Sequence, residues 1–134
     1  MRLFRYLPLL LLPLLAGCVD DRVAWEGEGS QVITIVREQH YLWDKNLDLS
    51  LVVSRMPDCS RRHALGKGTA QTRVDLWQYR ADTYVLQIGE RMYATETRTC
   101  EGLEKLTAEP PGGMGTPLGS FFEKGGKLVF EKAR

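Results

Sequence analysis

Apolar and polar residues alternate over much of the chain, and a period of two predicts β-strands with one buried face. In the segment 46–55, Leu47 and Leu49 alternate with polar residues. The segment 31–37 is rich in β-branched residues, which favour strands. Pro57 ends the segment 46–55, because proline cannot donate a hydrogen bond to a neighbouring strand.

The clearest pattern lies between residues 72 and 97, where three apolar segments are separated by short turns. The expected strands are 72–80, 83–88 and 92–98, with turns at 81–82 and 89–91. Three consecutive strands joined by short turns form an antiparallel meander.

The C-terminal third predicts a hairpin and one short helix. Two strands at 119–123 and 127–131 flank the turn residues Gly125 and Gly126. Leu103 and Leu106 have helical spacing, which predicts one or two helical turns within 101–109. The segment 110–117, rich in proline and glycine, is expected to be a loop.

These elements predict an all-β, mainly antiparallel protein. We expect a small barrel or a sandwich of about six or seven strands, with at most one short helix. The pattern leaves the choice between barrel and sandwich open.

The N-terminus differs from the rest of the chain. Arg2 and Arg5 precede residues 6–17, which carry no charged side chain and have the length of a secretory signal. A transmembrane helix would need about 20 apolar residues. Pro8 and Pro13 also interrupt the run, so a membrane-spanning helix is disfavoured.

The residues Leu15, Ala16, Gly17 and Cys18 that end this run resemble the lipobox of bacterial lipoproteins. The resemblance implies cleavage before Cys18, acylation of that cysteine and attachment to the cell envelope. Val19, in place of an aspartate, implies the periplasmic face of the outer membrane. Several acyl chains give a strong tether to the membrane. The alternative is an ordinary secreted protein cleaved near Ala16.

The resemblance also implies how the chain is divided. Residues 1–17 would be the signal peptide, residues 18–30 the lipidated cysteine and a polar tether, and residues 31–134 a β-rich periplasmic domain. Loss of Arg2 and Arg5 would leave 16 of the 18 basic residues against 17 acidic ones. No strong electrostatic field follows, so nucleic acid is not expected as a partner.

The three cysteines fit the same interpretation. Acylation of Cys18 would leave Cys59 and Cys100 as a pair, and a disulfide is the simplest outcome in an oxidising periplasm. Closing this loop would stabilise the fold by about 4 kcal/mol in the chain-entropy model.

A metal site is the alternative use of this cysteine pair. It would draw on both histidines of the chain, giving the set His40, Cys59, His63 and Cys100. The spacing matches no common zinc motif, and Arg61 and Arg62 would repel a cation. No metal is expected, and no cofactor other than the covalent lipid on Cys18.

Patterns typical of catalysis are missing from the sequence. There is no Gly-x-Ser-x-Gly elbow, and the glycines at 112–115 lack the Lys-Ser/Thr pair of a phosphate loop. No pair of carboxylates stands out for glycoside hydrolysis. We therefore expect the protein not to be an enzyme.

Two sets of residues are candidates for partner binding. Trp77 and Tyr79 fall on the strand face opposite the apolar positions and would present large rings to solvent, where recognition residues are found. Arg61, Arg62 and His63 form a small basic cluster beside Cys59. For the aromatic pair, the structural alternatives are a sheet buried on both faces and a bulge near Leu76 that rotates the alternation. For the basic cluster, the alternative is a plain solvated loop.

A further aromatic pair, Tyr41 and Trp43, lies in the polar connection 38–46. The sequence gives this pair no specific role.

The sequence therefore predicts a non-enzymatic binding or accessory module for an envelope partner. In size and class it is also similar to the membrane-bound lysozyme inhibitors, which implies inhibition of a cell-wall hydrolase as an alternative. The segment 89–93 matches their functional loop only in part, so no inhibitory residues are assigned. An enzyme acting on cell-wall glycan is the third hypothesis.

Overall fold

A computed structural model describes residues 19–134; the expected signal peptide and Cys18 lie outside this range. The described part of the chain forms ten strands and one short 3-10 helix. In chain order these are β1 (Asp20–Glu26), η3 (Glu28–Ser30), β2 (Gln31–Glu38), β3 (Leu47–Arg55), β4 (Cys59–Gly68), β5 (Val74–Arg80), β6 (Thr83–Ile88), β7 (Arg91–Glu96), β8 (Leu103–Leu106), β9 (Thr116–Lys124) and β10 (Lys127–Lys132).

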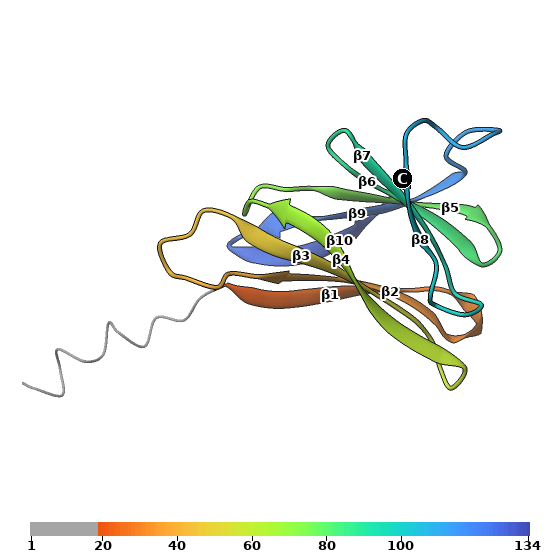
Figure 1. Cartoon of the computed structure of the whole chain (residues 1–134), viewed down its shortest axis with the longest axis horizontal. Helices are drawn as coiled ribbons and strands as arrows, with labels where there is room; N and C mark the ends of the chain where they lie inside the picture. The colour runs from red at the N-terminus through yellow and green to blue at the C-terminus, as the bar shows by residue number, and fades with distance from the viewer. Residues whose placement is uncertain (1–18) are drawn as a thin grey trace, which may run out of the picture.

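The strands form two antiparallel sheets that face each other (Figure 1). One sheet has four strands in the order β1-β2-β3-β4, and the other has six in the order β10-β9-β5-β6-β7-β8. The predicted all-β antiparallel class is confirmed, and the architecture is a sandwich rather than a closed barrel. Between residues 19 and 134 no helix is long and apolar enough to cross a membrane.

The hydrophobic core lies between the two sheets and is built from alternate residues of the central strands. Its fully buried members include Ile33, Ile35, Leu51, Val53, Leu76, Tyr84, Leu86 and Phe121. A buried amide joins the sheets at one end of this core: the Gln31 side-chain oxygen accepts hydrogen bonds from Tyr84 (2.8 Å) and Thr97 (2.6 Å).

All seven strands expected from the sequence are present. The segments 31–37 and 46–55 are β2 and β3, and the predicted meander is β5-β6-β7, whose strands are neighbours in the sheet. The predicted hairpin is β9-β10, with Gly125 and Gly126 in its turn.

The expected tether at 18–30 is shorter than predicted, because residues 20–26 form β1. β1 pairs with β2 along its whole length. Val23 and Trp25 pack against the core. The period of two was hidden because Asp21, the third inward residue, is an acid that serves in an ion pair.

The expected helix within 101–109 is wrong, because Leu103–Leu106 is the edge strand β8. Residues three apart in a strand point to opposite faces. Leu103 packs against the core, whereas Leu106 lines a pocket on the outer face of the sheet. The two leucines therefore contact two different surfaces of the sheet. Their separation of three positions resembles helical spacing only for this reason.

The segment after Cys59 is also a strand rather than a loop. β4 carries Arg61 and Arg62 along the edge of the four-stranded sheet. Leu65 is the extra residue of a β-bulge opposite Leu49 and Ser50. Gly66 follows with φ +84°, a conformation that favours glycine.

A buried ion cluster joins the sheets along the edge formed by β1 and β10. Arg37, which is 2% exposed, donates two hydrogen bonds to Asp21 (2.6 and 3.0 Å) and one to Glu123 (3.2 Å). The backbone N–H of Leu128 on β10 donates to the same Asp21 carboxylate at 2.9 Å. Burial would raise the pKa of Asp21, but these donors and the Arg37 charge outweigh it and hold the pKa below its usual value.

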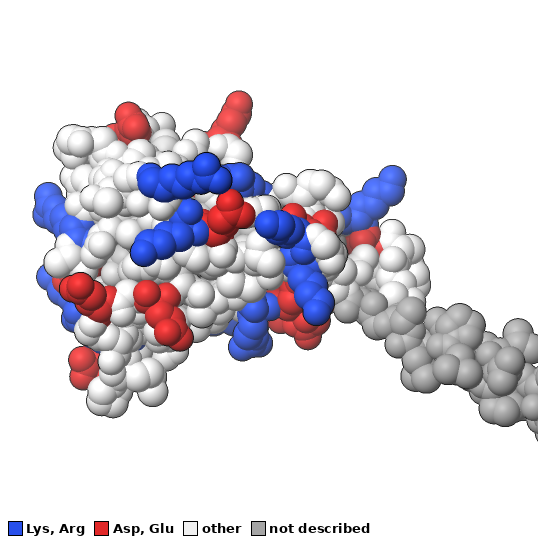
Figure 2. All heavy atoms as spheres, turned by 180° about the vertical axis from the view of Figure 1, so that it is seen from behind, with Lys and Arg blue, Asp and Glu red and all other residues white. Residues whose placement is uncertain are grey.

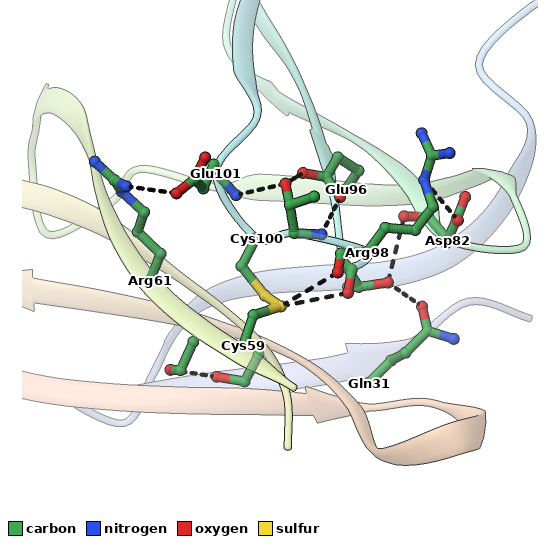
Figure 3. Close-up of a disulfide and its surroundings, with 12 residues drawn as sticks. Gln31, Cys59, Arg61, Asp82, Glu96, Arg98, Cys100 and Glu101 are labelled. Atoms are coloured by element: carbon green, nitrogen blue, oxygen red, sulfur yellow. Dashed lines mark hydrogen bonds and ion pairs between the residues drawn. A yellow bond between two sulfur atoms is a disulfide. The ribbon is translucent and has the colours of Figure 1, made fainter. Parts of the chain in front are cut away.

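A disulfide joins the sheets along the opposite edge. Cys59 on β4 is bonded to Cys100 in the loop after β7, with Cα atoms 5.8 Å apart (Figure 3). Toward the other end of β4, Arg91 of β7 donates to the carbonyls of Leu65 and Lys67, both at 2.8 Å. The predicted disulfide is confirmed.

Candidate partner-binding groove

The outer face of the six-stranded sheet carries a shallow groove over β5, β9 and the C-terminal residues. Its volume is about 270 Å³. The lining residues that carry its chemistry are Arg73, Asp75, Trp77, Ser120 and Phe122. The rings of Trp77 and Phe122 are half-buried, so one side of each ring faces solvent.

Strand alternation positions these side chains. On β5, Val74 and Leu76 are buried in the core, so Trp77 points outward. On β9, Phe121 is buried and the adjacent Phe122 faces outward. The antiparallel pairing of β5 with β9 then brings the two outward faces together.

Hydrogen bonds fix the polar side of the groove. Arg73 donates to Asp75 and to the Ser120 hydroxyl, both at 2.9 Å. Ser120 donates to Asp75 at 2.5 Å. The Arg73 guanidinium lies over the Phe122 ring, 5.3 Å from its centroid. The groove therefore combines aromatic rings with an exposed Arg73–Asp75 ion pair held in a fixed orientation.

Neither histidine of the chain hydrogen-bonds to Ser120. Ser120 has an acidic partner, but the two histidines are engaged elsewhere. His40 contacts Asp48, and His63 donates through Nε2 to the carbonyl of Cys100 at 2.7 Å.

Tyr79 lies on the same outward face as Trp77 but belongs to a different surface. Its hydroxyl donates to the Pro111 carbonyl at 2.7 Å. Residues 107–111 line a pocket with Tyr79 and Val85, and Val85 is fully buried although it faces outward. The loop after β8 therefore covers this part of the sheet, and Tyr79 is a packing residue more than an exposed one.

The two arginines do not form the expected cluster. Because they are consecutive on a strand, Arg61 and Arg62 point to opposite sides. Arg61 pairs with Glu101 at 3.5 Å, as Figure 3 shows, and Arg62 pairs with Glu38 at 2.9 Å. Neither arginine lines the groove around Trp77.

The four residues considered for a metal site are also separated by the structure. Cys59 and Cys100 form the disulfide, whereas His40 and His63 have the partners described above. Among residues 19–134, no three His, Cys, Asp or Glu side chains converge as metal ligands.

The sequence pattern identified Trp77 but missed the rest of the groove. A signal for Phe122 was present: in a strand, one of two adjacent phenylalanines must face outward. Arg73 and Ser120 carry no such signal, because they are 47 positions apart in the sequence and meet only where β5 pairs with β9.

Comparison of the chain with known protein families, with curated proteins and with solved structures finds no match to any of them. The groove is therefore interpreted from its own chemistry.

Proposed function

We propose that this chain is a lipid-anchored, non-enzymatic binding module at the periplasmic face of the bacterial outer membrane. It binds an envelope protein through the groove on the six-stranded sheet. The observation that carries this proposal is the partly exposed Trp77, which lines one groove with Phe122 and Arg73 on two paired strands.

The chemistry of the groove favours a protein partner. Tryptophan and arginine are enriched among the residues that dominate binding energy at protein interfaces. Strands hold these side chains in place, so little conformational entropy is lost on binding. Small-molecule sites usually enclose about 300–1,000 Å³ in a deep cleft, whereas this groove is smaller and open.

Anchoring would keep the module close to the membrane. Cys18, the proposed acylation site, directly precedes Val19, and β1 begins at Asp20. The folded domain therefore starts two residues after the lipid. A partner at the outer membrane or in the adjacent periplasm is within reach of such a module.

The lysozyme-inhibitor alternative has weaker support. The segment 89–93 that suggested it contains Arg91 and Tyr93, and both donate hydrogen bonds to the Leu65 carbonyl of β4. Side chains that hold two strands together are poorly available to an external enzyme.

The proposal is tested by site-specific photo-crosslinking in the native envelope. A photoreactive phenylalanine replaces Trp77 in one variant and Val52 in another. Val52 is a half-buried residue on the outer face of the other sheet and serves as the matched control. We expect one envelope protein to be captured from position 77 and not from position 52.

Equal capture from both positions, or none from position 77, would contradict the groove as the binding site. Capture of a cell-wall hydrolase from position 77 would replace the accessory function by inhibition. Inhibition of lysozyme by the purified protein would then be measured directly.

A further inference from the structure

We infer that the loop between β2 and β3 inserts Tyr41, Leu42 and Trp43 into the interfacial region of the membrane leaflet that holds the lipid on Cys18. The inference rests on the proposed function, because it takes the acylated Cys18 as the anchor. It adds a second membrane contact and a defined orientation of the domain.

The loop lies beside the point where the described chain begins. The Gln39 backbone N–H donates to the carbonyl of Val19 at 2.7 Å, and the Val19 N–H donates to the Gln39 side chain at 3.1 Å. Figure 1 shows this loop at the end of the sandwich where the chain enters β1. One peptide bond separates Val19 from Cys18, so the loop and the anchor must approach the same surface.

The three side chains are unusually exposed for their type. Trp43 is 80% exposed, and Tyr41 and Leu42 are both 56% exposed. Only one other large apolar side chain of the described residues, Met56, is comparably exposed. Met56 lies in the turn between β3 and β4, at the opposite end of the sandwich.

The loop holds these side chains in a fixed arrangement. The Gln39 amide donates to the carbonyl of Asp44 at 2.6 Å, and the Asp44 N–H donates to the carbonyl of Tyr41 at 3.1 Å. The rings of Tyr41 and Trp43 stack with their centroids 5.1 Å apart. Such an ordered apolar surface normally indicates a binding partner.

The chemistry of the surface matches a lipid interface. Tryptophan and tyrosine are enriched where hydrocarbon meets the headgroups, because each ring has an apolar body and a polar group. Charges around this end are mixed: Lys45 and Lys127 are exposed, but so is Asp20. Figure 2 likewise shows basic and acidic side chains interspersed on the face it presents. Insertion should therefore depend on the apolar side chains more than on anionic lipid.

The inference is tested by fluorescence quenching with the full acylated protein. The protein is purified from bacterial membranes, its acylation is verified by intact mass, and it is placed in vesicles of phosphatidylethanolamine and phosphatidylglycerol that carry brominated acyl chains. Bromine near the glycerol backbone should quench the tryptophan emission strongly, and bromine near the chain ends should quench it weakly. Trp43→Phe should lose most of this quenching.

Trp77→Phe is the matched control, since it removes a tryptophan outside the loop and should leave the absolute loss of emission on bromination unchanged. Leu42→Glu keeps all three tryptophans and should reduce the quenching, because the carboxylate opposes insertion. Unchanged quenching in Trp43→Phe would overturn the inference while the acyl anchor stands. An intact mass without acyl chains would remove the proposed anchor, and the inference with it.

Discussion

The two long edges of the sandwich are joined by different chemistry, although each brings strands of opposite sheets together. Along β1 and β10 the link is electrostatic: Arg37 is enclosed by the carboxylates of Asp21 and Glu123. Along β4 the link is covalent: Cys59 is bonded to Cys100 in the loop after β7, and Arg91 adds hydrogen bonds to backbone carbonyls toward the other end of β4. One edge depends on the charge of side chains, and the other depends on the redox state of two cysteines.

The two links also lie at opposite ends of the molecule. The Arg37 cluster is beside Asp21 near the start of β1, and the disulfide is at Cys59, whose neighbour Arg55 pairs with Gln31 at the other end of β2. Each link therefore holds the sheets together where the other does not. This division predicts that the two contributions to stability are separable, and that each responds to a different solution condition.

Breaking the covalent edge should have the largest effect. The double variant Cys59→Ala with Cys100→Ala removes a crosslink across 41 positions, which corresponds to about 4 kcal/mol in the chain-entropy model. We expect the free energy of unfolding, measured by urea denaturation at pH 7, to fall by about that amount.

Reduction of the unmodified protein serves as the control for this double variant. A reductant should lower the stability of the native chain to that of the variant and leave the variant unchanged. A variant as stable as the oxidised native protein would show that the disulfide does not limit the unfolding of this edge.

Breaking the electrostatic edge should cost somewhat less. Arg37→Met keeps most of the buried stem but leaves Asp21 and Glu123 without their cation. Removing one partner of a buried ion pair costs about 3–5 kcal/mol. We expect the lower end of this range, because the two carboxylates are 28% and 24% exposed. Urea denaturation again measures the change.

Two comparisons sharpen this second test. Combining Arg37→Met with Asp21→Asn and Glu123→Gln should recover part of the loss, since no unpaired buried carboxylate remains. The losses from Arg37→Met and from reduction should also add to within about 0.5 kcal/mol, as expected for distant sites. A strongly non-additive result would mean that the two edges unfold as one unit.

The sequence predicted the central strands better than the edge strands. β2, β3, β5, β6, β7 and β9 carry clear apolar periodicity because each has neighbours on both sides and a face on the core. β1, β4 and β8 lie at sheet edges, and their polar residues concealed them. The edge strand β10 was predicted because it contains Leu128, Val129 and Phe130.

Contacts between distant segments could be predicted only where a residue type has very few possible partners in the chain. Cysteine parity and the expected compartment were enough to pair Cys59 with Cys100. The Arg37 cluster joins residues 16 and 86 positions apart, and any of many carboxylates could have filled either place. The groove beside Trp77 has the same character, because Arg73 and Ser120 meet only once β5 and β9 are paired.

The smallest expected loss of stability comes from the loop that carries Cys100. It tests whether charged side chains also stabilise the edge that holds the disulfide. The Glu96 carboxylate accepts hydrogen bonds from the Thr99 backbone N–H (2.8 Å) and hydroxyl (2.5 Å), and from the Gly102 N–H (3.1 Å). Burial would raise the pKa of Glu96, but these donors outweigh it and lower the pKa to about 2. Glu96→Gln should cost about 1 kcal/mol at pH 7, the usual net value of one hydrogen bond.

The pH dependence of this effect has a defined sign. A carboxylate whose pKa is depressed in the folded state contributes stability above its ordinary pKa and loses that contribution as pH falls through the depressed value. The contribution of Glu96 should therefore be complete above about pH 4.5 and vanish near pH 2. Thermal unfolding from pH 7 to pH 2 should show native protein and Glu96→Gln converging in acid.

Glu104→Gln, which removes an exposed carboxylate of β8, controls for the change in net charge. A difference between native protein and Glu96→Gln that stays constant down to pH 2 would show that Glu96 acts by shape alone, and that the covalent edge is insensitive to acid.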